Sequence, residues 1–586
     1  MSPPSSPVGF RPTPSLTLSA VLVVCGFAAC GEPAAPPVAD RLFVGAPVYT
    51  VDAALPWAEA VAVANGRIVY VGEEGAARRL VGETTEIVEL AGGMVLPAFQ
   101  DAHIHPVMSG VEIGRCDLSV ASDRAALFDT IRACAERQSG EWLIGFGWEL
   151  PIFPDANPRA EWLDEIVPGR PVYLASADGH SAWVSSPALE LAGIDRETPD
   201  PPRGRIERDP VTGEPSGTLR EAAADLVEEL VPPAPLEERL QGLLLAQERL
   251  LTAGVSAVQD ASTRREYLEA YRRAEATGRL DLRVVAALWV DPERGVEQVD
   301  DLAALRDEFS SPAVRPTAAK LFLDGVIEAR TALMLEPYSD RPGYHGVPEW
   351  DRQQLLPVVA RLVEEGFDLH FHAIGDGAVR LALDAVEATR GIAEVAPGSA
   401  AAQRRPRHHV AHLEVIHPDD LSRFAVLEVG ADFQPLWAQA DTYIVDLTWP
   451  ALGPERSRWL YPIGSVHRAG GRLVFGSDWS VSSLDPLDGI EVALTRRSVD
   501  GSTEALLPGE AIDLATALEA YTLGAAWANG LDGDSGSLEV GKRADLVVLD
   551  QNLFELPSER LAEAEVVRTV IAGADVYRID ESTSRR

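Results

Sequence analysis

Positive charge is scarce in this sequence. The 586 residues include 51 Lys and Arg against 90 Asp and Glu, which gives a formal net charge of −39 at pH 7. An acidic surface of this kind repels nucleic acid phosphates and anionic lipid headgroups. We therefore expect no nucleic acid partner. The composition, with 46% hydrophobic residues, fits a globular protein with a large core and leaves its oligomeric state open.

Cysteine is also scarce, with four in the whole chain. Cys25 and Cys30 belong to an apolar N-terminal segment, which leaves Cys116 and Cys134 for the folded part. If the protein is exported, these two thiols meet an oxidising compartment, which favours a disulfide between them. Two buried free thiols are the alternative interpretation, because sequence spacing does not fix the distance between their Cα atoms.

Long apolar runs are missing beyond the first thirty residues. The run Leu16–Ala29 is about 14 residues long, too short for the roughly 20 that span a bilayer. Small residues then precede Cys30, as in a bacterial lipoprotein signal, although Phe27 is unusual at its position. We predict a signal at 1–30, a Pro-rich tether at 31–41, and an exported protein in the bacterial cell envelope that meets the membrane only through lipid on Cys30. An ordinary secretion signal cut near Ala29 is the alternative.

The order of the apolar runs predicts an α/β fold. Short β-rich runs occupy 42–96 and return over 536–580, so the two chain ends are expected to pair into one small β-sandwich domain. Between them, over 97–535, apolar runs alternate with segments of helical period, which is typical of parallel βαβ units. About eight such strands predict a (β/α)₈ TIM-like barrel with insertions. The predicted barrel strands include Pro171–Ser176, Val255–Asp260, Ala318–Asp324, Phe367–Ala373, His408–Glu414 and Arg472–Asp478.

Histidines and acids gather at the ends of these predicted strands. His103 and His105 alternate along a strand, so their side chains share a face, and two imidazoles suit a borderline-soft divalent ion such as Zn²⁺. Alone, this pair is weak support for a metal site. Other ligand-type residues strengthen the prediction of a metal site. The chain has only 11 histidines, and further ligand types follow at the ends of other predicted strands. These are Lys320, His372, His412 and Asp478.

Several ordered motifs resemble a known family. They are Trp142–Trp148, Asp178–Trp183, Gly213–Glu221, Lys320–Gly325, Phe475–Trp479 and the closing segment Gly536–Leu549. Together with the histidine motifs, they make the chain similar to the amidohydrolase superfamily, and to its amidohydrolase-3 branch that includes N-substituted formamide deformylases. The resemblance runs from about Val44 to Val576 and implies a metal-dependent hydrolase of a carbon–nitrogen bond other than a peptide bond.

The resemblance implies a role for each matching residue. His103 and His105 would be first-strand metal ligands, joined by His372 and His412 from the fifth and sixth strands. Asp478 would be the eighth-strand carboxylate that carries the proton of the attacking water. His412 would alternatively donate to the oxyanion.

Lys320 matches the position at which relatives carry a carbamylated lysine between two metals. A plain lysine paired with a carboxylate is the alternative, so one or two divalent ions, with Zn²⁺ favoured, stay open.

Three further residues are candidate substrate contacts. His180 resembles a substrate-contacting histidine of the family, with a structural hydrogen-bonding role as the alternative. Asp324 and Arg330 follow Lys320 closely and could meet polar groups of the substrate. His370 alternates with His372 on a strand and is therefore a candidate for contact with the metal ligands. Four tryptophans could line an aromatic pocket, although ordinary packing is the preferred interpretation for any single one of them: Trp148, Trp183, Trp437 and Trp479.

The preferred function is hydrolysis of an amide-like, N-formyl or cyclic amide substrate by a metal-activated water. A lactone or ester hydrolase with the same metal centre is the second interpretation. A non-catalytic periplasmic binding protein on a hydrolase fold is the third. The intact set of ligand-type residues argues against the third interpretation.

Overall fold

The computed structural model describes residues 38–90, 92–391 and 405–579. Eight parallel strands form one sheet, each hydrogen-bonded to the next. In pairing order they are β18 (Arg472–Phe475), β17 (Gly430–Phe433), β16 (His409–His412), β15 (Asp368–Ala373), β14 (Val314–Phe322), β13 (Arg283–Trp289), β12 (Val255–Thr263) and β6 (Phe99–Ile104). Just past β18, the N–H of Asp478 donates to the carbonyl of His103 in β6 at 2.7 Å, so the two outer strands meet. The predicted TIM-like barrel is confirmed.

Burial explains why these segments become barrel strands. Strand β15 is buried at every position and β12 at all but one, as expected for parallel strands covered on both faces. Helices between the strands present apolar sides to the sheet, as in α7 (Leu236–Thr252) and α10 (Arg352–Glu364). Helix α7 packs closely on α2 (Pro106–Arg115), where a Cβ on Gly110 would lie 2.0 Å from the carbonyl oxygen of Gly242. Only glycine allows this approach.

Both chain ends contribute to a second, mixed sheet. Its strands from the N-terminal part are β1 (Ala39–Tyr49), β2 (Trp57–Ala64), β3 (Arg67–Gly72), β4 (Val81–Glu89) and β5 (Met94–Pro97). Its strands from the C-terminal part are β19 (Leu546–Leu549), β20 (Val566–Ile571) and β21 (Ala574–Arg578). Strand β5 pairs antiparallel with β19, with Val95 opposite Val548. The predicted pairing of the two ends is therefore confirmed.

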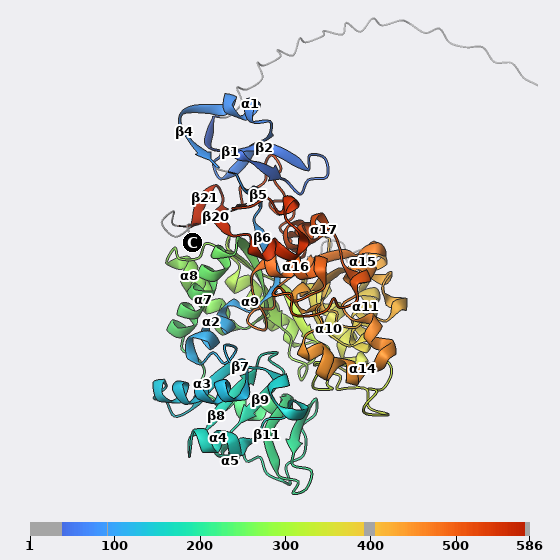
Figure 1. Ribbon diagram of the computed structural model, residues 1–586. Helices are drawn as coiled ribbons and strands as arrows, with labels where there is room; N and C mark the ends of the chain where they lie inside the picture. The colour runs from blue at the N-terminus through green and yellow to red at the C-terminus, as the bar shows by residue number, and fades with distance from the viewer. Residues whose placement is uncertain (1–37, 91, 392–404, 580–586) are drawn as a thin grey trace, which may run out of the picture. The chain divides into compact units, whose positions relative to one another are not determined.

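A third sheet is inserted between barrel strands β6 and β12. It contains β7 (Leu143–Trp148), β8 (Val172–Ser176), β9 (Ser181–Val184), β10 (Gly204–Arg208) and β11 (Pro215–Glu221). The labels of β7, β8, β9 and β11 lie close together in Figure 1. The run Pro171–Ser176, predicted as a barrel strand, lies here as β8, so that placement was wrong. An apolar run indicates a buried strand, but it does not say which sheet buries it. The cores of this insert include the tryptophans Trp148 and Trp183.

Cys116 and Cys134 are joined by a disulfide beside the insert, with their Cα atoms 5.8 Å apart. Cys134 lies in α3 (Arg124–Arg137), and Cys116 follows α2. Among the described residues, no helix has the length and apolar character needed to cross a bilayer. The predicted signal at 1–30, its Cys30 and most of the predicted tether at 31–41 lie outside the described residues.

Candidate metal centre

The predicted ligands come from the carboxyl ends of barrel strands. His103 lies near the end of β6, and His105 begins the turn into α2. His372 and His412 lie at the ends of β15 and β16, and Asp478 follows β18. Because parallel strands of a barrel end at one face, residues far apart in sequence meet there.

Asp478 stands at the centre of the cluster. Its Oδ1 lies 3.1 Å from Nε2 of His105 and 3.5 Å from Nε2 of His103, and its Oδ2 lies 3.8 Å from Nδ1 of His412. One potential ligand atom each from His103, His412 and Asp478 falls within 4.8 Å of the others. These three side chains are buried, so they can hold an ion away from bulk water.

Two more predicted ligands flank this set. The His372 ring lies 4.4 Å from the His412 ring, centroid to centroid, and its Nε2 is 3.4 Å from the carbonyl oxygen of Gly325. Lys320 is fully buried in β14, and its Nζ lies 3.4 Å from Nε2 of His103. Burial lowers the pKa of Lys320 to about 7, against the opposing charges of Asp478 and Asp432. The structure thus brings together all six predicted ligands.

The protonation states of the cluster fit a divalent cation. Burial, with the charge of Lys320 nearby, lowers the pKa of His103 well below its usual value, and burial does the same for His372. Burial alone would raise the pKa of Asp478, but the adjacent His105 outweighs it and the net shift is downward. Neutral imidazoles and an ionised carboxylate are the forms that bind metals. Oδ1 of Asp478 is buried, and no residue of the described part of the chain donates a well-aligned hydrogen bond to it, which leaves it available to a ligand.

The backbone at two of these residues is strained. His412 has φ 77° and Asp478 has φ 53°, in the left-handed region that non-glycine residues rarely occupy. Such conformations cost on the order of 1–3 kcal/mol each and persist where surrounding structure enforces them, typically at functional sites. The strain therefore supports a functional assignment for this end of the barrel.

His180 reaches the same end of the barrel from the insert. Its Nδ1 lies 2.8 Å from Oε2 of Glu221, at the end of β11, and its ring centroid is 5.0 Å from that of His372. Burial acts to lower the pKa of His180, but the charge of Glu221 outweighs it and raises the pKa to about 9. The ring is therefore a cationic hydrogen-bond donor beside the cluster.

Asp324 and Arg330 are engaged within the protein. The Asp324 carboxylate accepts backbone N–H bonds from Leu333, Ile374 and Gly375 at 2.8–3.1 Å. The Arg330 guanidinium donates to Oδ2 of Asp340 at 2.6 Å. These bonds give both residues a role in holding the loop after β14, and contact with substrate stays a prediction.

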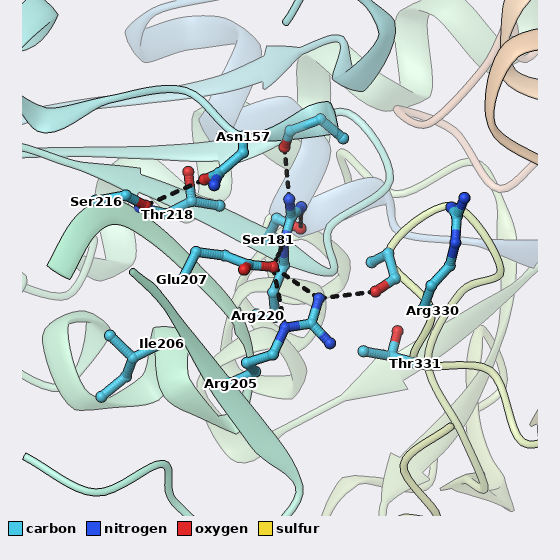
Figure 2. Close-up of polar contacts among 12 residues, drawn as sticks. Asn157, Ser181, Arg205, Ile206, Glu207, Ser216, Thr218, Arg220, Arg330 and Thr331 are labelled. Carbon is cyan, nitrogen blue, oxygen red and sulfur yellow. Dashed lines mark hydrogen bonds and ion pairs between the residues drawn. The ribbon is translucent and has the colours of Figure 1, made fainter. Parts of the chain in front are cut away.

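A polar network braces that loop from the insert. Figure 2 shows Arg205 between Glu207 and the loop that carries Arg330 and Thr331. Arg205 donates to Oε1 of Glu207 at 2.7 Å and to the carbonyl of Ala329 at 2.9 Å. The insert therefore positions a loop next to the candidate metal centre.

Several neighbours of the ligands were missed or only partly anticipated. Gln434, just past β17, lies with its Oε1 2.9 Å from Nδ1 of His412. The Trp437 ring stacks on the same imidazole, with ring centroids 5.5 Å apart and an angle of 2° between the ring planes. This contact agrees with the aromatic lining considered for it. Asp101 accepts from the backbone N–H groups of His103 and Ser477, which ties β6 to the segment after β18. Gln434 directly follows a strand and Asp101 lies two residues before His103, and these positions were the available signal.

Comparison with known proteins agrees with this geometry. The sequence profile of the amidohydrolase family matches residues 86–577. The chain is 31% identical over 552 residues to protein LONG AFTER FAR-RED 3 of Arabidopsis thaliana, covering 92% of each chain. It is 29% identical to N-substituted formamide deformylase of Arthrobacter pascens, covering 92% of this chain and 98% of that one.

A solved structure is also similar. An uncharacterized metal-dependent hydrolase from Pyrococcus horikoshii matches with a TM-score of 0.69 and 27% identity, over 88% of this chain and 99% of that one. The family profile covers far more than half of the sequence. The chain belongs to the amidohydrolase family.

Proposed function

We propose that this protein hydrolyses a carbon–nitrogen bond in an N-formyl or other amide-like small molecule. The observation that carries the proposal is the buried convergence of His103, His412 and Asp478, with ligand atoms within 4.8 Å of one another. The similarity to N-substituted formamide deformylase over nearly the whole chain supports the bond type.

The donor set favours Zn²⁺ as the resident ion. Imidazole nitrogens with a carboxylate suit a borderline-soft divalent cation, and the predicted ligands His103, His105, His372, His412 and Asp478 would hold it. When bound, such an ion supplies Lewis acidity and makes water a nucleophile near neutral pH. Lys320 would add an anionic oxygen ligand after its neutral Nζ attacks CO₂, forms an N–C bond and releases a proton.

The remaining chemistry falls to side chains of this protein. Asp478 Oδ1, which lacks a well-aligned hydrogen bond, accepts the proton of the attacking water. The same proton then passes to the departing nitrogen as the carbon–nitrogen bond breaks. His180, held by Glu221, donates to the carbonyl oxygen of the substrate as negative charge develops there.

The test combines metal analysis with a substrate panel. Purified protein should contain Zn²⁺ or another divalent ion in stoichiometric amount, and bicarbonate should increase the bound metal if Lys320 is carbamylated. It should hydrolyse N-formyl amines and simple amides faster than matched esters and lactones. Absence of turnover on every substrate after loading with Zn²⁺ or Mn²⁺ would contradict the proposed hydrolase activity. Faster turnover of esters would replace it with an ester hydrolase.

We further infer that the protein is exported and lipid-anchored, from the sequence up to Cys30. The Cys30→Ser variant should leave the membrane fraction and appear in the soluble fraction of the cell envelope. Unchanged membrane association of that variant would rule out the lipid anchor.

A further inference from the structure

A buried hydrogen bond leads away from the metal-ligand candidate His103. Its Nδ1 lies 2.9 Å from Nε2 of His370, and Nδ1 of His370 lies 2.7 Å from Oε1 of Gln259. These three side chains come from β6, β15 and β12, and each is at most 1% exposed. They therefore form a contact chain across the barrel interior that water does not reach.

The chain continues to the loop beyond the last barrel helices. Nε2 of Gln259 donates to Oδ1 of Asn529 at 3.2 Å, and Nδ2 of Asn529 donates to Oε1 of Gln100 at 3.2 Å. Nε2 of Gln100 then donates to Oγ of Ser535 at 2.8 Å, and this hydroxyl donates to the carbonyl of Leu531 at 3.3 Å. The last acceptor is a backbone carbonyl, which has no proton to give.

The terminal carbonyl gives every bond in the chain one direction. Each amide uses its NH₂ group on the side facing Leu531, so Gln259 offers only its Oε1 to His370. Nδ1 of His370 must then carry the hydrogen, and in this neutral ring Nε2 accepts. Nδ1 of His103 is the donor to it, which leaves the lone pair of His103 on Nε2.

That nitrogen faces the candidate metal centre. Nε2 of His103 lies 3.5 Å from Oδ1 of Asp478 and 3.4 Å from Nζ of Lys320. His412 shows the same polarity, since its Nδ1 contacts Oε1 of Gln434 at 2.9 Å. The Nε2 atom of Gln434 donates in turn to Oδ1 of Asp432.

We propose that this one-way chain of hydrogen bonds fixes the tautomer and the orientation of His103, and that His370 and Gln259 are positioning residues for the metal site. The inference rests on the proposed metal-dependent function. It also explains a second group of potential ligands, His103, His370 and Asp432, whose atoms lie within 4.8 Å of one another. Both ring nitrogens of His370 are engaged in the chain, so this group serves the metal site and does not form another one.

The test is Zn²⁺ affinity of the full chain, measured by competition with a chromophoric chelator. Gln259→Met removes the acceptor and should weaken Zn²⁺ binding by about 10- to 100-fold, the usual effect of losing a partner of a metal-bound histidine. Gln259→Glu keeps an acceptor oxygen for Nδ1 of His370. The amides of Asn529 and Gln100 can both rotate to donate toward position 259, and the Ser535 hydroxyl can then donate to Oε1 of Gln100. This matched variant should stay within about threefold of the wild type. The visible spectrum of the Co²⁺ form should shift in Gln259→Met and not in Gln259→Glu.

Circular dichroism of the metal-free variants checks their folding, and Asn529→Leu against Asn529→Asp repeats the comparison one step further along if a Gln259 variant does not fold. Equal Zn²⁺ affinity of Gln259→Met and wild type would overturn the inference. So would equal losses in Gln259→Met and Gln259→Glu, which would indicate a packing role alone. A wild-type protein that binds no metal would instead overturn the proposed function.

Discussion

Two buried charged side chains differ in their hydrogen-bond partners: Arg220 in the insert and Asp478 at the barrel mouth. The guanidinium of Arg220 donates to Oγ of Ser181 at 2.6 Å, to the carbonyl of Ala156 at 2.5 Å and to Oε1 of Glu207 at 3.3 Å. Oδ1 of Asp478 is also buried, and no described residue donates a well-aligned hydrogen bond to it, although Nε2 of His105 lies 3.1 Å away.

The difference separates a structural charge from a functional one. Removing a charge from water costs several kcal/mol unless new partners replace the lost hydration. Arg220 finds those partners within the insert, so its burial fixes strands β9, β10 and β11 together. Asp478 keeps an open acceptor, which is the arrangement expected of a group that meets a ligand or a proton during turnover.

The largest expected effect tests the functional half of this comparison. Asp478→Asn keeps the shape of the side chain but removes its basicity, so kcat should fall by about 10³-fold, or about 4 kcal/mol. Bound metal, measured by elemental analysis, should be retained through the histidines. Near wild-type turnover in this variant would remove Asp478 as the proton carrier.

The structural role of Arg220 predicts that its replacement lowers the stability of the fold without loss of bound metal. Arg220→Met leaves Glu207 and its neighbours with fewer partners and should lower the free energy of unfolding by about 3 kcal/mol in urea. Zn²⁺ affinity should stay at the wild-type value. The control is Arg265→Met, which removes an exposed ion pair with Glu308 and should lower the free energy of unfolding far less, because exposed ion pairs contribute little to stability. Equal losses in the two variants would contradict the structural role of Arg220.

The smallest expected effect lies where the two regions meet. Glu221→Gln removes the charge that keeps His180 cationic, so kcat/KM should fall about tenfold with metal content unchanged. In a His180→Asn background the same substitution should have almost no further effect, because the two residues act as one unit. Additive losses in this double-mutant cycle would show that Glu221 works through another contact.

Much of the candidate metal centre could be predicted, because ligand-type residues and the strands that carry them can both be recognised in short segments of the sequence. His103, His372 and His412 each sit at the end of an apolar run, and parallel barrel strands end at one face. Gln259 and Gln434 could not be assigned in this way. A glutamine in a strand carries no chemistry of its own, and its role depends on which side chain the next strand places against it.

The segment Pro171–Ser176 shows the same limit at the level of the fold. Its composition correctly indicated a buried strand, yet the structure places it in the insert and not in the barrel. Strand pairing depends on contacts between distant segments, which the local period does not contain. Asp324 is a further case, since backbone donors from its own loop and from the segment after β15 decide what its carboxylate does.

The sequence by itself determined the barrel, the joining of the chain ends, and the set of histidines and acids that we predict to bind metal. Periodicity and residue chemistry are local properties, so they can be recognised in the linear sequence. Only the tertiary structure decided that Arg220 is satisfied while Asp478 is left open, and that a chain of amides orients His103. Hydrogen-bond partners and burial arise when remote strands pack, so the chemical state of each ligand is a property of the folded protein.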